Sequence, residues 1–209
     1  DRIRGQAGSD FIDGRGGSQD VLDYSQNNAT QGISVSLSGV TVELGGQTLT
    51  GGSANDGLGG MDTLISIENV RGSAGADIII GDANNNNFRG NAGNDTLDGD
   101  DGTFDVADYS NASAAVTVDL GAGTASGTAI GNDSLTRIEV VWGSAFADTL
   151  IGGNGNDVLR GNAGSDSIVG GEGSGDIVFF ASATTGISVN LETGFAQDGQ
   201  GGTDTLTGI

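Results

Sequence analysis

GGNGNDVLR at residues 152–160 runs directly into GNAGSDSIV at residues 161–169. Both blocks follow the pattern G-G-x-G-x-D-x-U-x, in which U is a large apolar residue and Asn162 replaces the second glycine. We expect the glycines at positions one and four to take positive φ values, which lets the chain turn tightly without a Cβ clash. The last three positions suit a short strand in which only U points inward. Each block therefore predicts one turn followed by one short strand.

The same block recurs in three sets along the chain. A truncated set occupies residues 1–23, and fuller sets occupy 72–108 and 143–179. Spacers with alternating apolar residues follow at 24–71 and 109–142, and residues 180–209 begin another. Set and spacer together repeat every 71 residues, and the longer first spacer predicts an insertion near 38–60. Because no Pro-rich or Ser-rich linker separates the copies, we expect one continuous solenoid.

Nine residues reverse the direction of such a chain, so eighteen residues complete one coil and the turns stack in two rows. A turn and the turn two blocks later then lie side by side, and their Asp carboxylates converge. Two carboxylates with several carbonyl oxygens make a suitable shell for Ca²⁺, which accepts about 6–8 oxygen ligands. Mg²⁺ fits less well because it requires octahedral geometry. Zn²⁺ is disfavoured because the chain has neither His nor Cys.

Composition supports a metal-dependent fold. The chain has 209 residues with 41 Gly and no Pro, and only 35% of residues are hydrophobic, below the usual ~45–50%. The net charge of −21 disfavours nucleic acid and anionic membranes as partners and favours cations. A disordered acidic chain is the alternative, but here the acidic residues are regularly spaced. No apolar run is long enough for membrane insertion. Both ends fall within the pattern, which favours a piece of a longer protein.

An enzyme is the first rival class, and the composition argues against it. Without His, the chain cannot build a Ser-His-Asp triad or an H-E-x-x-H zinc site. Paired Asp residues could act as a glycosidase acid pair. They lie inside the repeat, however, where a metal ligand is the simpler interpretation. We therefore predict a protein that is not an enzyme.

About ten blocks in register resemble the RTX (repeats-in-toxin) family of secreted proteins, for which this nonapeptide is the calcium signature. The blocks cover slightly under half of the chain, and the spacers resemble those of large RTX adhesins and surface proteins. The resemblance implies an all-β fold, a right-handed parallel β-roll or β-solenoid with calcium-binding turns. It also implies a chain that is secreted unfolded, folds on extracellular Ca²⁺, and belongs outside the cell or at the surface of a Gram-negative bacterium.

The resemblance also assigns ligands by their position in the block. The side chains at position six are Asp1, Asp10, Asp20, Asp77, Asn86, Asp95, Asp105, Asp148, Asp157, Asp166 and Asp176. Asn86 stands where the pattern has Asp, so we expect a weaker, neutral ligand there. In the family, loop carbonyl groups complete the shell, which implies Gly72, Ala74, Gly90, Ala92, Gly143, Ala145, Gly161 and Ala163.

The coil length predicts which side chains share an ion. The expected pairs are Asp148 with Asp166, Asp157 with Asp176, Asp77 with Asp95, and Asn86 with Asp105. Asp10 has no partner two blocks later, so we expect at most a partial site. Phe146 replaces a glycine at position four, and one extra residue precedes Asp20, Asp105 and Asp176. These loops are expected to deviate.

Two non-enzymatic functions remain open. One is a stalk or adhesin segment of a giant surface protein, which the 71-residue unit favours. The other is a folding and secretion module attached to a secreted protease, lipase, epimerase or toxin. The expected partners are calcium ions and neighbouring repeats of the same chain, with any cell-surface or matrix partner unidentified. Tyr24 and Tyr109 favour rung packing over sugar stacking, and Glu68 and Glu139 favour a structural role.

Overall fold

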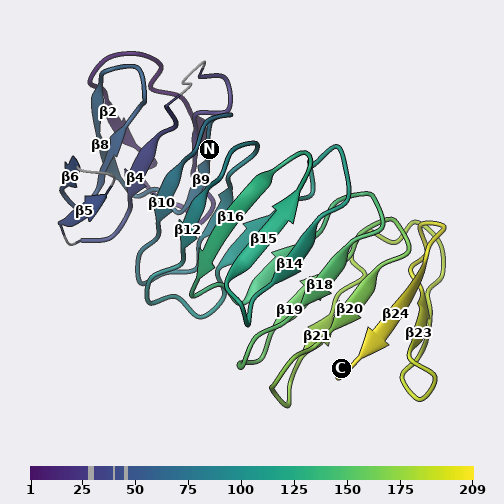
Figure 1. Ribbon diagram of the computed structural model, residues 1–209. Coiled ribbons are helices and arrows are strands. Elements are labelled where there is room, and N and C mark those ends of the chain that lie inside the picture. The colour runs from purple at the N-terminus through teal and green to yellow at the C-terminus, as the bar shows by residue number, and fades with distance from the viewer. Residues whose placement is uncertain (28–30, 40, 45–46) are drawn as a thin grey trace. The chain divides into compact units, whose positions relative to one another are not determined.

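The computed structural model describes residues 1–27, 31–39, 41–44 and 47–209, and in these ranges every helix or strand is a short β-strand (Figure 1). The chain divides into two compact units, Asp1–Val106 and Ala107–Ile209. Within the described ranges, no helix is long and apolar enough to cross a lipid bilayer. The fold is therefore all-β, as the sequence predicts.

The first unit holds two layers of strands. One layer has the order β1-β3-β9-β11, and the other has the order β2-β8-β7-β4-β10-β12. The strands are β1 (Arg2–Ile3), β2 (Phe11–Asp13), β3 (Val21–Asp23), β4 (Ser34–Ser36), β7 (Ser53–Asn55), β8 (Met61–Ile65), β9 (Asn69–Arg71), β10 (Ile78–Ile80), β11 (Asn87–Arg89) and β12 (Thr96–Asp98). A separate antiparallel hairpin, β5 (Val42–Leu44) and β6 (Gln47–Leu49), lies within the 38–60 stretch.

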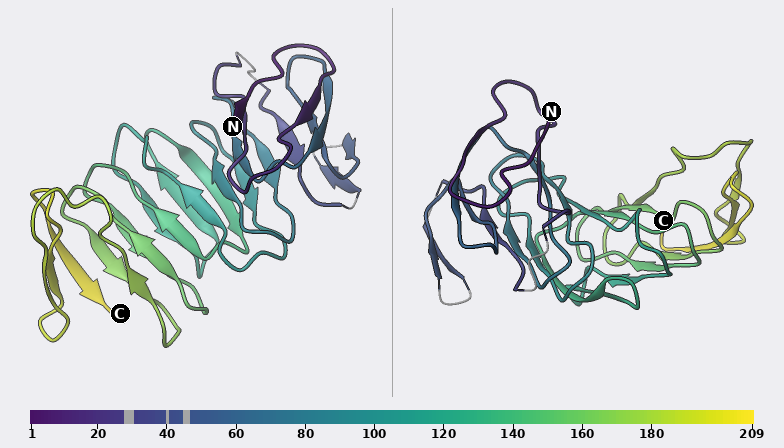
Figure 2. Two further views of the ribbon diagram at one scale, coloured as in Figure 1. Left: turned by 180° about the vertical axis from the view of Figure 1, so that it is seen from behind. Right: turned by 90° about the horizontal axis from the view of Figure 1, so that it is seen from above.

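The second unit repeats this arrangement, and its layers can be followed in teal to yellow in Figure 2. One layer contains β17-β19-β21, and the other has the order β16-β15-β14-β18-β20-β24-β23-β22. The strands are β14 (Thr117–Asp119), β15 (Thr124–Gly127), β16 (Gly131–Thr136), β17 (Val140–Trp142), β18 (Thr149–Ile151), β19 (Val158–Arg160), β20 (Ser167–Val169), β21 (Ile177–Val178), β22 (Ser188–Asn190), β23 (Phe195–Gln197) and β24 (Thr203–Thr207). The unit boundary falls within β13 (Val106–Asp108).

Consecutive nonapeptides place their strands in alternate layers. β18 pairs in parallel with β20, so that Leu150 faces Ile168, and β19 pairs in parallel with β21, so that Leu159 faces Val178. Strands one coil apart are therefore neighbours in the same layer. This is the parallel β-roll that the eighteen-residue coil predicts.

The core is a column of single inward side chains. Because alternate side chains of a strand point to opposite faces, a three-residue strand can send only its middle residue inward. The middle residues of the complete blocks are wholly buried: Ile79, Phe88, Leu97, Leu150, Leu159 and Ile168. Spacer residues extend the column, since Val35 is in register with Ile79 and Val118 with Leu150.

The spacers add a feature that the predicted rungs do not include. Each spacer folds into three antiparallel strands, β4-β7-β8, β14-β15-β16 and β22-β23-β24. The glycine that precedes the middle strand has a φ of 68° at Gly123 and 70° at Gly194. Glycine adopts this left-handed conformation readily, so the chain can return beside the strand it has just left. Antiparallel hairpins thus interrupt the parallel roll at regular intervals.

Candidate calcium sites

Aspartates at position six of the nonapeptide contact each other across one coil. The backbone N–H of Asp148 donates to Oδ1 of Asp166 at 2.8 Å, and that of Asp157 donates to Oδ1 of Asp176 at 2.9 Å. Asp148, Asp157 and Asp166 are each at most 3% exposed. The structure therefore brings together the two pairs that the coil length predicts in this unit.

The first unit shows the same contact. The N–H of Asp77 donates to Oδ1 of Asp95 at 2.9 Å, and that of Asn86 donates to Oδ1 of Asp105 at 2.7 Å. Asp105 and Asp176 follow an extra residue in their loops, yet both carboxylates keep the one-coil contact. The extra residue is accommodated earlier in the loop and does not displace these side chains.

The glycine at position one serves close approach. A Cβ on Gly161 would overlap Oδ2 of Asp166, and the same overlap would occur between Gly72 and Asp77. Positive φ values fall instead at position two, with 69° at Asn162, and at position four, with 133° at Gly164. The expectation of positive φ at position one is thus wrong, because the constraint there is the adjacent carboxylate.

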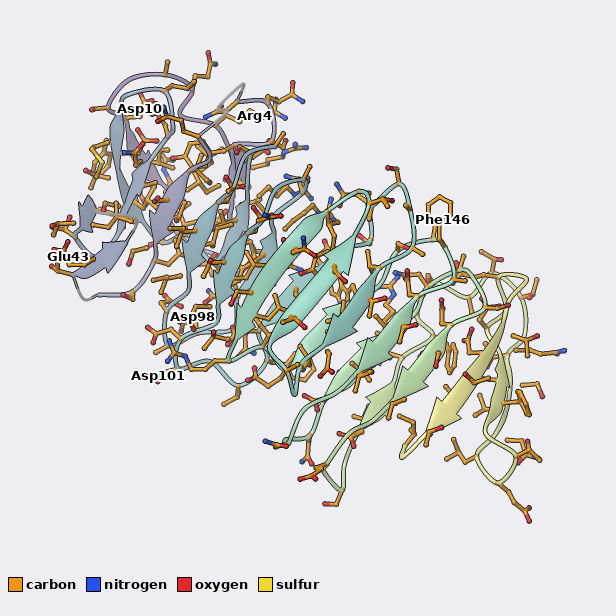
Figure 3. All side chains as sticks on the ribbon, viewed as in Figure 1. Arg4, Asp10, Glu43, Asp98, Asp101 and Phe146 are labelled. Atoms are coloured by element: carbon orange, nitrogen blue, oxygen red, sulfur yellow. The ribbon has the colours of Figure 1, made fainter. Side chains whose placement is uncertain are left out.

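The first loop of each full set has a different form, which explains how Phe146 is tolerated. In this loop Oδ1 of Asp148 accepts from Ser144 Oγ at 2.7 Å and from Val116 N–H at 2.8 Å, while Oδ2 accepts from Ser144 N–H at 2.6 Å. Phe146 N–H donates to Ser144 Oγ at 3.1 Å. Its side chain projects from a turn into solvent (Figure 3). The loop is built by the Ser144 hydroxyl and needs no left-handed residue at position four.

Several buried carboxylate oxygens lack a hydrogen-bond partner in the described part of the chain. Examples among the predicted ligands are the Oδ2 atoms of Asp10, Asp20 and Asp166. A buried charged oxygen is costly unless a counter-charge or donor compensates it. These hard anionic oxygens, with loop carbonyl groups close by, are the donor set that calcium prefers. The residues present therefore fit a calcium ion.

Electrostatics at these sites are unfavourable without a cation. Burial is the largest cause of the raised pKa of Asp166, which reaches about 7, and repulsion from Asp204, Asp148 and Asp198 adds to it. Burial, together with the nearby Asp176, also raises the pKa of Asp157. Burial raises the pKa of Asp148, although hydrogen bonds from Val116 and Ser144 oppose the shift. Asp148, Asp157 and Asp166 are thus destabilised in their charged form.

The predicted carbonyl ligands differ in their contacts and in their exposure. The Gly72 and Gly143 oxygens accept hydrogen bonds from the side-chain amides of Asn91 and Asn162 one coil later, at 2.7 and 2.6 Å. The Gly90 and Gly161 oxygens lie against Gly72 and Gly143 respectively. Ala74 and Ala145 are exposed, whereas Ala92 and Ala163 are half-buried. In the described ranges, no group of three or more His, Cys, Asp or Glu side chains forms a metal cluster by itself.

Two further predicted ligands differ from the rest. The side chain of Asp1 is 84% exposed, and its α-ammonium group donates to Oδ1 of Asp20 at 2.6 Å. The side chain of Asn86 is buried, and it accepts from Asp82 N–H and donates to the Glu68 carbonyl, both at 2.9 Å. Asn86 thus preserves the turn with internal hydrogen bonds.

The structure reveals acidic residues at equivalent positions in the spacers. Oδ1 of Asp62 accepts from Asp10 N–H at 2.9 Å, and Oδ1 of Asp204 accepts from Asp166 N–H at 3.0 Å. Asp10 therefore has a partner that the sequence prediction did not assign to it. Asp62 and Asp204 lie two residues before the buried Leu64 and Leu206, the same offset as in the nonapeptide. That offset is the signal that could have identified them.

The two tyrosines bind spacer acids, Tyr24 the Asp62 just described and Tyr109 its equivalent Asp133, 71 residues later. The Tyr24 hydroxyl donates to Oδ2 of Asp62 at 2.5 Å, and the Tyr109 hydroxyl donates to Oδ2 of Asp133 at 3.1 Å. Both tyrosines are at most 2% exposed. Burial, followed by the hydrogen bond to Asp62, raises the pKa of Tyr24. Packing between rungs is thus their role, and neither ring is available to a sugar.

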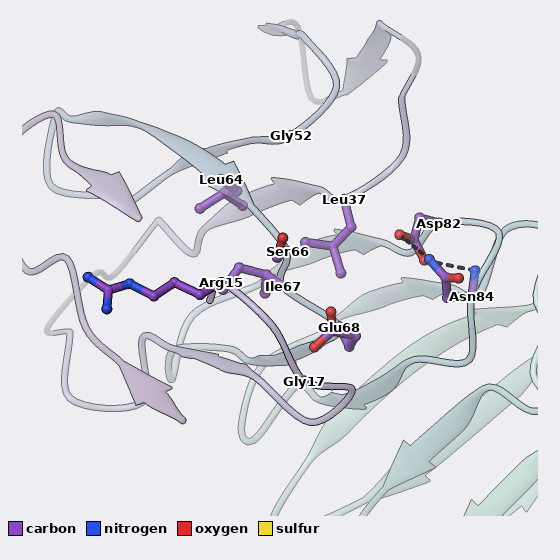
Figure 4. A pocket seen from close by; sticks show the side chains of 10 residues that line it. All are labelled: Arg15, Gly17, Leu37, Gly52, Leu64, Ser66, Ile67, Glu68, Asp82 and Asn84. Carbon is purple, nitrogen blue, oxygen red and sulfur yellow. Dashed lines mark hydrogen bonds between the residues drawn. The ribbon is translucent and has the colours of Figure 1, made fainter. Parts of the chain in front are cut away.

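Two hollows recur at equivalent positions of the long repeat. A hollow of about 260 Å³ in the first unit is lined by Arg15, Glu68 and Asp82 among others, with Asn84 hydrogen-bonded to Asp82 (Figure 4). One of about 150 Å³ in the second unit is lined by Glu139 and its neighbours. Glu68 and Glu139 are 71 residues apart. Both hollows thus belong to the turn that follows each spacer hairpin.

Fold and site together define a parallel β-roll with calcium-binding turns. The sequence model of one family, described as the RTX calcium-binding nonapeptide repeat (4 copies), matches residues 1–18, 70–103 and 142–177. The chain therefore carries RTX calcium-binding nonapeptide repeats, and repeats of this kind bind calcium ions. No curated protein matches the sequence.

Proposed function

We propose that the chain is a calcium-dependent structural β-roll segment, of stalk or adhesin type, of a large secreted or cell-surface bacterial protein. It performs no catalysis, binds neither nucleic acid nor the membrane interior, and folds on extracellular calcium. The repeat sets at 1–23, 72–108 and 143–179 carry the position-six ligands. The single observation that supports this best is the one-coil contact between buried aspartates, with carboxylate oxygens left unpaired.

Calcium acts as the folding switch in this proposal. Extracellular calcium modules bind with Kd values of about 10⁻⁴–10⁻³ M. At ten times its Kd, one site stabilises the folded chain by about 1.4 kcal/mol. Several such sites approach the ~5–15 kcal/mol stability of a whole domain. In cytosol this contribution disappears, while the burial and the carboxylate repulsion that raise the pKa values of Asp157 and Asp166 remain.

A second candidate is a non-catalytic folding and secretion module of an RTX enzyme or toxin. Both candidates need the same calcium chemistry. The 71-residue unit, with an antiparallel hairpin in each spacer, favours the stalk, because a regular unit can be extended by repetition. Further copies of this unit in the parent gene would support the stalk, and a neighbouring catalytic or pore-forming domain would support the module.

Circular dichroism tests the calcium dependence. In chelator the chain should be mostly coil, and millimolar Ca²⁺ should convert it to a β-rich form. The same concentration of Mg²⁺ should produce little change, because Mg²⁺ retains its water shell. A chain that is equally folded in chelator and in calcium would overturn the proposal.

A double-mutant cycle tests the ligand pairs. Asp148→Ala and Asp166→Ala should be strongly non-additive in calcium affinity, since either change alone removes their common site. Asp157→Ala and Asp166→Ala affect different layers of the roll and should be nearly additive. Strong coupling between Asp157 and Asp166 instead would reject this assignment of pairs.

A further inference from the structure

A short motif in the spacers lies outside the segments that the RTX family model matches. D-G-x-G-G-x-D occurs at 56–62 and at 198–204. The middle spacer has Gly127 where the others have Asp56 and Asp198, and Ile130 where they have a glycine. The motif forms the turn between the second and third strands of its hairpin.

Asp198 is held in this turn with one oxygen satisfied and the other not. Its side chain is 0% exposed. Oδ1 accepts backbone N–H groups from Gln200 at 2.8 Å, Gly201 at 3.1 Å and Gly202 at 2.9 Å. Oδ2 is buried and has no hydrogen-bond partner in the described part of the chain. The turn therefore fixes the carboxylate and leaves one anionic oxygen for a ligand.

The adjoining nonapeptide loop, residues 161–166, places further oxygens beside this turn. Asp166, 1% exposed, also has a buried Oδ2 without a hydrogen-bond partner. Its N–H donates to Oδ1 of Asp204 at 3.0 Å, and Thr203 N–H donates to Ser165 Oγ at 3.1 Å, so loop and hairpin lie in contact. A Cβ on Gly202 would overlap the Gly164 carbonyl oxygen and lie 2.8 Å from Oδ2 of Asp198. Gly202 thus lets the Gly164 carbonyl oxygen and Oδ2 of Asp198 approach each other closely, because a side chain at this position would collide with both.

We propose that a calcium ion bridges the nonapeptide loop 161–166 and the hairpin turn 198–202. Its ligands are Oδ2 of Asp198, Oδ2 of Asp166 and the carbonyl oxygen of Gly164. This proposal rests on calcium binding by the nonapeptide loops, because Asp166 belongs to one of them. It extends calcium binding into the spacers, so that each ion of this kind fastens a hairpin to the roll.

The first unit contains a second instance. Asp56 is 0% exposed, and its Oδ1 accepts from Leu58 N–H at 2.7 Å and Gly60 N–H at 2.8 Å. A Cβ on Gly60 would overlap the Gly8 carbonyl oxygen and lie 2.7 Å from Oδ2 of Asp56. Oδ2 of Asp10, in the same loop as Gly8, is buried without a hydrogen-bond partner. Oδ2 of Asp56 accepts from Gly8 N–H at 3.3 Å, a hydrogen bond that Asp198 does not have in the described part of the chain. Loop 5–10 and turn 56–60 therefore repeat the close approach of turn carboxylate and loop carbonyl oxygen.

The middle spacer provides an internal control. Ile130 is 2% exposed and packs where the other hairpins have the acidic turn. A Cβ on Gly127 would lie 3.3 Å from Cγ1 of Ile130 and 3.5 Å from Cγ1 of Val116. An apolar side chain thus closes this turn. The fold accepts either a buried carboxylate or an apolar plug at the same place.

Native mass spectrometry in saturating calcium can count the bound ions. Asp198→Asn and Asp56→Asn should each bind one calcium ion fewer than the wild type, and the double variant two fewer. Glu192→Gln changes an exposed acid of the same hairpin and should bind as many ions as the wild type. Asp157→Ala should lose an ion of the nonapeptide row.

A second variant, in which one hairpin turn replaces another, distinguishes loss of the calcium site from misfolding of the chain. Replacing residues 198–202 by the sequence of 127–131 installs the apolar plug, and circular dichroism should show a folded chain with one ion fewer. An unchanged ion count in both Asp198→Asn and the graft would overturn the hairpin site. If Asp157→Ala still loses an ion in that case, the proposed function stands. A wild-type chain that binds no calcium would overturn both proposals.

Discussion

The two spacer hairpins of the second unit share a backbone but close it in different ways. In β14–β16 the Tyr109 hydroxyl reaches Asp133, and Ile130 fills the turn. In β22–β24 the equivalent aromatic residue is Phe180, which has no hydroxyl, and the turn holds the buried Asp198. One hairpin is held by apolar and hydroxyl contacts, and the other has a charge that needs compensation.

Their outer strands differ as well. Val118 in β14 is wholly buried, because β14 pairs in parallel with β18 and Val118 meets Leu150. Val189, its counterpart in β22, is 42% exposed, and the described pairing of β22 is with β23. A spacer strand therefore acquires its burial from the neighbouring coil and not from its own hairpin. The stability of each hairpin depends on what lies beside it.

The largest effect should come from breaking the core that both hairpins depend on. Ile168 is 0% exposed and in register with Leu206 of β24. Ile168→Asp should abolish folding even in saturating calcium, since an unpaired buried carboxylate costs several kcal/mol. Ser167→Asp, on the outward side, should lower the melting temperature only slightly. Equal melting temperatures for the two variants would show that the inward register is wrong.

Calcium depletion should separate the two hairpins. Hydrogen exchange followed during a chelator titration should show loss of protection in β22–β24 at higher free calcium than in β14–β16. Two differences favour this order: only the former hairpin contains the uncompensated Asp198, and among the described strands its outer strand β22 lacks the parallel neighbour that β14 has in β18. Simultaneous loss of protection in both hairpins would mean that the turn type has no influence on local stability.

The pH dependence should change sign with calcium. Without calcium, Asp166 has a pKa of about 7 in the folded chain against 3.8 ordinarily, so the folded state binds more protons in this range. Lowering the pH from about 7 to 4 should therefore increase the free energy of unfolding of the calcium-free chain. With calcium present, protons compete for the same carboxylates, and the calcium midpoint should rise. Asp166→Asn should reduce both effects in titrations followed by circular dichroism.

The smallest effect should come from removing the hydrogen bond between the Tyr109 hydroxyl and Asp133. Tyr109→Phe gives the middle hairpin the aromatic residue of the last one and removes the hydroxyl from buried Asp133. A hydrogen bond to a charged group contributes about 1.5–3 kcal/mol, so thermal denaturation in calcium should show a loss of this order. A loss confined to calcium-free conditions would indicate that a cation takes over at Asp133.

The ligand pairs illustrate how far the sequence alone could lead. Asp148 with Asp166 and Asp157 with Asp176 follow from counting two blocks along the chain, because every intervening residue belongs to the same period. Asp10 with Asp62 and Asp166 with Asp204 are 52 and 38 residues apart, and a spacer of irregular length separates them. No period relates these positions, so only the folded hairpin identifies the partners.

The sequence by itself determined the turn, the short strand, the inward residue and the coil of eighteen residues. These are local properties of nine residues, set by glycine sterics and side-chain alternation. Only the tertiary structure decided that spacers fold back as antiparallel hairpins, that Tyr24 and Tyr109 bind spacer acids, and that Asp198 is left with an unpaired oxygen. Those features depend on which segment lies beside another across a variable loop. Whether a side chain is buried, and whether its charge is compensated, therefore depends on the segment that packs beside it.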